Sequence, residues 1–144
     1  MTRIDSFSGQ YHFLSNFFPC LVTYEGIEFP SSENAFQAAK TLNVDARKIF
    51  ALKEVSPGMS KHLGRAIVLR PNWDTIRLVT MADILKAKFQ DPALTKLLIA
   101  TGDAELIEGN TWGDTFWGVC DGKGTNFLGK ALMDLRKKLT AKRA

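Results

Sequence analysis

The sequence predicts an α+β fold: a compact, mainly helical single domain of residues 1–144 with a small, mostly N-terminal β-sheet. The length of 144 residues, with 45% hydrophobic and 24% charged residues, suits one globular domain. Strand and turn signals are concentrated in the first 30 residues. From residue 31 onward, helical patterns with recognisable start signals follow one another to the C-terminus.

The N-terminal strands are expected to form a hairpin. The segments "LVTY" (21–24) and "IEF" (27–29) are rich in β-branched and aromatic residues. They flank Glu25 and Gly26, which predicts a two-residue turn between antiparallel strands. Later in the chain, "AELIEG" (104–109) alternates apolar and polar residues, a pattern typical of a strand.

Helix start signals precede each helical pattern. A serine, asparagine or aspartate stands where its side chain can accept a hydrogen bond from the first turn. Proline takes the first helical position after Ser56 and after Asp91. The aromatic segment 11–19, by contrast, is interrupted by Ser15 and Asn16 and is expected to be a loop. The predicted helices begin at Ser31 or Ser32 (to about Lys40), Asn43 or Asp45 (to 52), Ser56 (to about Gly64), Asn72 (to 89), Asp91 (to Gly102) and Thr125 or Asn126 (to 139).

Charge and composition narrow the possible partners. Residues 130–144 carry six Lys and Arg against one Asp, a net +5, so the first 129 residues of this +4 chain sum to −1. Cations at a helix C-terminus are favourable in themselves, but clustered Lys and Arg are also the footprint of nucleic-acid binding. No apolar run reaches the ~20 residues of a membrane span, so no membrane partner is expected.

Cysteine usage and the N-terminus indicate a cellular location. The first residues lack the apolar core of a signal peptide. Cys20 and Cys120 are the two cysteines, and without secretory features they are expected to be reduced thiols. We therefore expect a soluble, cytoplasmic protein, and the sequence does not fix its oligomeric state.

The helix at 32–40 carries an acid and an amine. Glu33 and Lys40 are seven positions apart, which is about 700° and within ~20° of two full turns. They share one stripe with Phe36 and Gln37, and this stripe could face a cleft. The alternative is a solvated stripe, with the acid near the positive end of the helix dipole and the lysine near the negative end. Spacing alone favours the solvated stripe slightly.

A second candidate region is the tryptophan- and glycine-rich segment before the last helix. Trp112 and Trp117 offer flat faces on which a nucleobase could stack, and Asp114 is an acid between them. Glycines such as Gly118 let a backbone approach a ligand closely. Asn126 could cap the last helix or donate to a ligand. The alternative is a glycine-rich loop with two core tryptophans and a surface aspartate.

Other motifs point away from cofactor chemistry. His12 and His62 stand in neither an HExxH nor a CxxC context, and no GxGxxG or GxxxxGK[ST] loop occurs. These patterns give little support to a zinc site and none to a P-loop or a dinucleotide fingerprint. Arg77 and Lys88 lie close to one face of the long helix and could hold a phosphate, but a solvated face is the simpler interpretation.

Five segments taken together resemble the NADAR family. The resemblance runs from about Ile4 to Leu139 and has one notable departure, Asn34, where the family commonly has histidine. It implies a mainly helical α+β domain with no metal or organic cofactor. The segments, in order, are "FLSNFFP", "FPSSENAFQAAK", "WDTIRLVTMADILKAKF", "LLIATGDAELIEGNTWGDTFWG" and "GTNFLGKALMDLR".

The resemblance implies N-glycosidase chemistry, the hydrolysis of the bond between a base and C1′ of a ribose. The substrate would be a small ribosyl phosphate, namely a ribosylamino-pyrimidine phosphate of riboflavin biosynthesis, or an ADP-ribosylated guanine in nucleic acid. A non-catalytic module that binds ADP-ribose or NAD-derived ligands is the alternative. The presence of both Glu33 and Lys40 favours the enzyme, because a protein that only binds the ligand has no need of both an acid and an amine.

Within this chemistry, we hypothesise a role for each of the candidate residues. Lys40 would attack C1′ and form a Schiff base, with Glu33 as acid and base and Asp114 as the second carboxylate. In a second mechanism, Lys40 is only a charge partner and Glu33 activates water. The remaining site residues would bind the substrate: Ser15, Asn16, Phe36, Gln37, Trp112, Trp117, Gly118 and Asn126.

Overall fold

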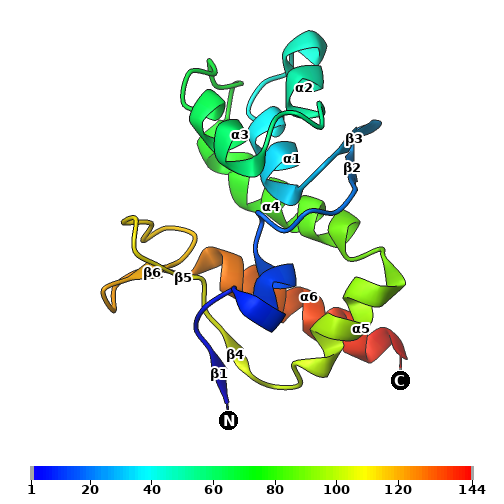
Figure 1. The fold of residues 1–144 in the computed structure, drawn as a ribbon, viewed down its shortest axis with the longest axis vertical. Coiled ribbons are helices and arrows are strands. Elements are labelled where there is room, and N and C mark those ends of the chain that lie inside the picture. Colours follow the sequence, from blue (N-terminus) through cyan, green and yellow to red (C-terminus); the bar gives the residue numbers. More distant parts are fainter. Residues whose placement is uncertain (1, 144) are drawn as a thin grey trace. The chain divides into compact units, whose positions relative to one another are not determined.

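The computed structural model describes residues 2–143 and confirms the predicted α+β class (Figure 1). Helices dominate, and the strands are short. The helices are η1 (Gly9–Leu14, a 3₁₀ helix), α1 (Ser32–Ala39), α2 (Val44–Phe50), α3 (Pro57–Gly64), α4 (Trp73–Lys88), α5 (Pro92–Ala100) and α6 (Phe127–Arg143). The strands are β1 (Arg3–Ile4), β2 (Val22–Tyr24), β3 (Ile27–Phe29), β4 (Glu105–Leu106), β5 (Gly109–Asn110) and β6 (Val119–Cys120).

The described residues group into two compact units. One unit is Asn16–Lys88, and the other joins the residues up to Ser15 with those from Phe89 onward. Each unit has its own short strands and helices and is described by itself below. A single domain over residues 1–144 stays a prediction.

In the unit Asn16–Lys88, the predicted hairpin is confirmed. Strands β2 and β3 pair antiparallel, with Val22 opposite Phe29. Glu25 and Gly26 both have positive φ angles, 47° and 84°. A two-residue turn with this geometry matches the twist of the flanking strands, and glycine adopts it without steric cost.

Helix α1 is the central element of this unit. It contacts β2 and β3 and also packs against α2, α3 and α4 (Figure 1). All eight of its residues are buried. Ala35, Ala38 and Ala39 are fully covered, and their small side chains allow the surrounding elements to approach the helix backbone.

Asn34 ties the start of α1 to the segment that ends α2. Its side-chain amide donates hydrogen bonds of 2.8 Å to the carbonyl oxygens of both Phe50 and Val55. Its oxygen accepts a 2.8 Å bond from the Ser31 hydroxyl, which in turn caps the helix by accepting from the Asn34 backbone N–H. The side chain is fully buried, so each of these groups depends on Asn34 for a partner.

Replacing Asn34 by leucine is therefore expected to cost stability. Asn34→Leu leaves two buried carbonyls without their donor, and we expect the free energy of unfolding to fall by about 2–4 kcal/mol. Urea denaturation measures this. Asn43→Ala, which removes the exposed cap of α2, is the control and is expected to cost about 1 kcal/mol. A cost for Asn34→Leu no larger than the control would contradict this account.

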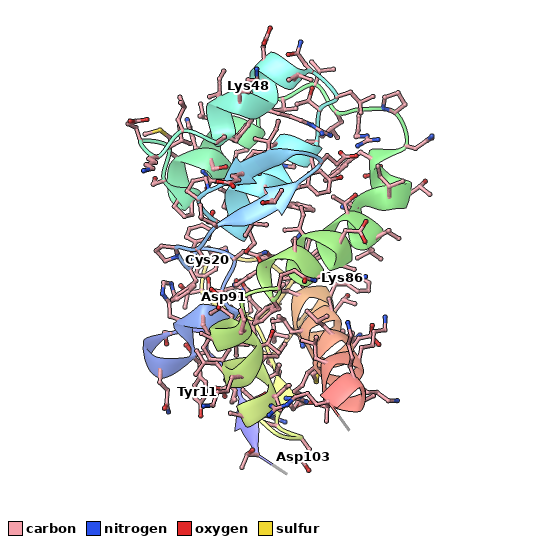
Figure 2. The ribbon with its side chains drawn as sticks, turned by 90° about the vertical axis from the view of Figure 1, so that its right-hand side faces the viewer. Tyr11, Cys20, Lys48, Lys86, Asp91 and Asp103 are labelled. Atoms are coloured by element: carbon pink, nitrogen blue, oxygen red, sulfur yellow. The ribbon has the colours of Figure 1, made fainter. Side chains whose placement is uncertain are left out.

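The other unit contains two parallel strand pairs. Strand β1 pairs with β4, with Arg3 opposite Glu105, and β5 pairs with β6. Helix α6 contacts β4 and α5. Asp91, which is labelled in Figure 2, caps α5 as predicted. Its Oδ1 accepts from the Ala93 N–H at 2.8 Å.

Two expectations for local structure need correction. The segment expected to be a loop before Ser15 contains the 3₁₀ helix η1, which ends with a bond from the Ser15 N–H to the His12 carbonyl. The small sheet is divided into three two-stranded ladders. Single-strand patterns did not indicate β1, β5 or β6, because strands of two residues are too short to show a period.

Candidate active site

The acid–amine stripe of α1 is buried rather than solvated. Glu33 is 8% exposed and Gln37 is 5% exposed. Lys40 follows directly after α1 and is half-buried. The solvated-stripe interpretation of the spacing was therefore wrong. Periodicity identified the stripe but could not show that strands and three other helices cover this helix.

The Glu33 carboxylate is held by a short hydrogen bond. The side-chain amide of Gln37, one turn later on α1, donates to Glu33 Oε2 at 2.6 Å. A buried carboxylate without such partners would be strongly destabilised, so this bond offsets part of the free-energy cost of burying Glu33.

Asn16 anchors the N-terminal end of the same helix. Its backbone carbonyl accepts from the Glu33 N–H at 3.0 Å. Its side-chain oxygen accepts from the Ser32 hydroxyl at 2.9 Å, and its amide donates to the Met81 sulfur at 3.6 Å. The structure thus brings Asn16 to the first turn of α1, as expected for one site, and gives it a part in fixing the backbone of Glu33.

The environment of Lys40 lowers the pKa of its amine. Burial lowers the pKa of the Lys40 ammonium group below its usual value. The Glu33 carboxylate opposes this shift by raising the pKa, and the Arg65 guanidinium lowers it further. The net lowering is the direction that a nucleophilic lysine requires.

The connection between α3 and α4 borders the same end of α1. The Arg70 backbone N–H donates to the Lys40 carbonyl at 2.7 Å. Arg65, the residue that caps the C-terminus of α3, stands at the start of this connection. Lys40 is therefore surrounded by its own helix and by a segment that carries a second cation.

Phe36, predicted to contact substrate, lies in an aromatic pair. Its ring centroid is 5.2 Å from that of Trp73 at the start of α4, and the two planes are tilted by 51°. Both side chains are about 5% exposed. The contact joins α1 to α4 and is worth about 0.5–1.5 kcal/mol beyond area burial. Substrate contact by Phe36 stays a prediction.

In the other unit, Asp114 organises a turn. Its Oδ1 accepts from the backbone N–H groups of Phe116 and Trp117, at 3.1 and 2.9 Å. The Asn110 side chain forms two hydrogen bonds with the backbone of Asp114: its oxygen accepts from the Asp114 N–H, and its amide donates to the Asp114 carbonyl. A role as the second carboxylate stays a prediction, alongside this turn-forming role.

The two tryptophans of this segment differ in exposure. Trp112 is 61% exposed, so the alternative of a core residue is wrong for it. Trp117 is half-buried and meets Phe116 edge to face, with centroids 4.9 Å apart. Gly118 is required by packing, because a Cβ there would overlap the Glu108 side chain.

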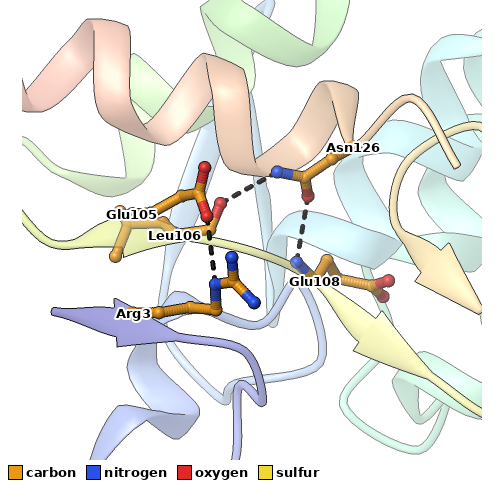
Figure 3. A network of polar contacts seen from close by, with 5 residues as sticks. All are labelled: Arg3, Glu105, Leu106, Glu108 and Asn126. Carbon is orange, nitrogen blue, oxygen red and sulfur yellow. Dashed lines mark hydrogen bonds and ion pairs between the residues drawn. The ribbon is translucent and has the colours of Figure 1, made fainter. Parts of the chain in front are cut away.

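Asn126 bridges two backbone positions, as Figure 3 shows. Its amide donates to the Leu106 carbonyl at 2.9 Å, and its oxygen accepts from the Glu108 N–H at 3.0 Å. Nearby, Arg3 pairs with Glu105 at 3.2 Å across β1 and β4. Asn126 thus fixes the strand from which the tryptophan segment departs, and its binding to ribose or phosphate oxygens stays a prediction.

Sequence reasoning did not single out Glu108 and Asn110. The Asn110 amide donates to Glu108 Oε2 at 2.9 Å, so a half-buried carboxylate lies beside the Asp114 turn. Their spacing of two residues was a usable signal, because positions i and i+2 of an extended segment share one side.

Lys88 was also misjudged as part of a solvated face. It is 1% exposed, and burial lowers the pKa of its ammonium group to about 8. Its Nζ lies 5.8 Å from the centre of the Phe18 ring. Helical spacing from the buried residues Met81, Ile84 and Leu85 would have placed Lys88 on the apolar face of α4. Being fully covered, it cannot replace Lys40 as a nucleophile.

Among residues 2–143, His, Cys, Asp and Glu side chains form no group of three or more that could hold a metal ion. None of the helices in that range is long and apolar enough to cross a membrane.

These features define an α+β protein in which the central helix of the unit Asn16–Lys88 carries a buried acid, with a partly buried amine directly after it. The family model of the NADAR domain matches residues 5–140, and the chain therefore belongs to the NADAR family. It is 39% identical over 139 residues to the N-glycosidase YbiA of Escherichia coli (strain K12), covering 93% of this chain and 85% of that protein.

Two more comparisons extend this result. The chain is 37% identical over 139 residues to a riboflavin biosynthesis protein of Vibrio vulnificus (strain YJ016), covering 88% of this chain and 35% of that longer protein. The NMR structure of E. coli YbiA matches with a TM-score of 0.86 and 36% identity, over 99% of this chain and 87% of that one. The fold is therefore that of a solved family member.

Proposed function

We propose that this protein is an N-glycosidase, a hydrolase that cleaves the bond between a base and C1′ of a ribose. The observation that carries the proposal is the acid–amine stripe of α1, where Glu33 is buried and the pKa of Lys40 is lowered. The name of the similar E. coli protein, N-glycosidase, agrees with it. Burying a carboxylate and an amine costs free energy, and a helix that served only for packing would need neither group.

The reaction we propose for Lys40 is covalent. Its neutral Nζ attacks C1′ as the bond from C1′ to the base nitrogen breaks. The Glu33 carboxylate takes the proton that the alkylated Nζ loses and passes it to the departing base. The ribose ring opens to give a Schiff base, which water then hydrolyses to free the amine and the sugar. The carboxylate of Glu33 also stabilises positive charge on the sugar in an oxocarbenium-like transition state. In the second mechanism, Glu33 activates water directly and Lys40 contributes only its charge.

Two substrate classes follow from this chemistry. A ribosylamino-pyrimidine phosphate is favoured by the similarity to a protein named for riboflavin biosynthesis. ADP-ribosylated guanine in nucleic acid is favoured by the basic end of α6, which includes Lys142 and Arg143, because phosphate backbones attract such clusters. Both substrates present the same bond to C1′.

We propose Asp114 as the second carboxylate. One substitution distinguishes a catalytic role of its negative charge from its structural role in forming the turn. Asp114→Asn keeps a side-chain oxygen for the Phe116 and Trp117 N–H groups while it removes the charge. We expect kcat to fall by about 10²-fold or more with no loss of stability. Asp114→Ala, which also removes the turn, is the comparison. Equal rates for Asp114→Asn and the unmodified protein would contradict the catalytic role of Asp114 and show that it only forms the turn.

The proposal is tested by incubating the protein with three substrates and measuring the released base by chromatography. The substrates are a ribosylamino-pyrimidine phosphate, an ADP-ribosylated guanine oligonucleotide and NAD. We expect release of free base from one of the first two. Tight binding without product from all three would favour the alternative, a module that binds ADP-ribose or NAD-derived ligands.

A further inference from the structure

We propose that Gln37 is a positioning residue that fixes the Glu33 carboxylate, and that Gly64 of α3 in turn fixes Gln37. This inference rests on the proposed role of Glu33. It changes the expectation that Gln37 binds substrate, and it adds Gly64, which no sequence motif indicated. The three residues form a chain of direct contacts from α3 to the acid on α1.

The first contact is between Gln37 and Glu33. The Gln37 amide nitrogen donates to Glu33 Oε2 at 2.6 Å, and both side chains are more than nine-tenths buried. The opposite amide orientation would set the Gln37 oxygen against the carboxylate, so the ionised acid selects the orientation observed. A short bond to a charged acceptor is among the stronger hydrogen bonds in proteins.

The second contact is between Gln37 and Gly64. Gly64 is buried at the last position of α3, and a Cβ there would overlap the oxygen, Cδ and Cγ of Gln37. The amide plane therefore rests directly on the backbone of α3. Only glycine leaves this space open for the Gln37 amide. The backbone conformation does not require glycine here, because the φ angle of Gly64 is not positive.

The far side of the Gln37 amide is held by this packing. Its Oε1 is buried and has no hydrogen-bond partner among the described residues. It faces the Cα–H of Gly64, a contact that restricts the amide but contributes little energy. A methyl group at residue 64 would force the amide to rotate or withdraw, and the donor to Glu33 would move with it. A misplacement of about 1 Å at a catalytic group can cost 10²-fold in rate.

A double-mutant cycle tests this arrangement. We would measure kcat and KM for Gly64→Ala, Gln37→Ala and the double variant. Gly58→Ala is the matched control, because it lies on the same helix and a Cβ there meets nothing within 4 Å. If Gly64 acts through Gln37, each single variant lowers kcat about 10- to 100-fold with KM little changed, and the double variant is no worse than Gln37→Ala. The control keeps normal kcat.

A second readout does not need activity. NMR titration of the ¹³C-labelled Glu33 carboxyl reports its protonation directly. Loss of the Gln37 donor disfavours the ionised form, so the titration midpoint is expected to rise in Gly64→Ala and Gln37→Ala by similar amounts and to stay fixed in Gly58→Ala. Lys40, which interacts electrostatically with both Glu33 and Arg65, is retained in all variants, as is Arg65.

The outcomes separate this inference from the proposed function. Unchanged kcat and an unchanged midpoint in Gly64→Ala would overturn the inference, as would kcat losses that multiply in the double variant. Either result leaves the N-glycosidase proposal intact if Glu33→Gln is inactive. If no substrate is turned over, the proposed function fails, and the NMR midpoints alone decide whether Gly64 and Gln37 position Glu33.

Discussion

Glu33→Gln is expected to lower kcat by about 10³-fold or more. The substitution keeps the size of the side chain and an oxygen that can accept the hydrogen bond from Gln37, so α1 stays packed. What is lost is the negative charge that stabilises the oxocarbenium-like sugar and the group that moves the proton. Steady-state release of base measures the rate, and urea denaturation verifies that the variant is folded.

A matched control isolates the charge of Glu33 from charge in general. Glu28 on β3 is exposed, and Glu28→Gln makes the same change in net charge in the same unit. We expect it to retain normal kcat and KM. Near-normal turnover in Glu33→Gln would contradict the assignment of Glu33 as a catalytic residue, whatever the control shows.

Lys40→Met is expected to lower kcat by at least about 10²-fold, a loss of ~2.7 kcal/mol in transition-state stabilisation. Methionine retains an unbranched, flexible side chain of similar length, which suits the half-buried site. The variant removes both the amine that would attack C1′ and the charge that would assist in the second mechanism. Lys48→Met on the exposed side of α2 is the control and is expected to be fully active (Figure 2).

The pH dependence of Lys40 has a definite sign. Nucleophilic attack needs the neutral amine, so the rate rises as pH rises through the pKa of Lys40. Because burial lowers that pKa, the rise is expected below the ~10.4 of a free lysine. Lys40→Arg keeps a charge but has no neutral form near pH 7. An arginine variant with near-normal rate would therefore favour the second mechanism.

Local signals in the sequence were sufficient for most elements. The turn at Glu25 and Gly26 and the caps at Ser31, Asn43, Ser56 and Asp91 depend on neighbouring residues only, and the structure confirms them. The pairing of β1 with β4 joins residues about 100 positions apart through two-residue strands, and no local pattern records such a contact.

The candidate site was predictable in its residues but not in its environment. Helical spacing aligned Glu33 with Lys40, yet it could not show that the whole of α1 is buried, since that depends on β2, β3 and three other helices. Gly64 could not be recognised for a related reason: its importance comes from a side chain on another helix. Lys88 was expected on a solvated face because lysine is usually exposed, but its side chain is buried.

We propose above all that Glu33, in the first turn of α1, and Lys40, directly after its last turn, act together on C1′. Borohydride trapping during turnover, followed by peptide mass spectrometry, tests it most directly. We expect a stable ribosyl adduct on Lys40 in the unmodified protein and none in Lys40→Met. Full turnover with no adduct on Lys40, or an adduct on a different lysine, would contradict it.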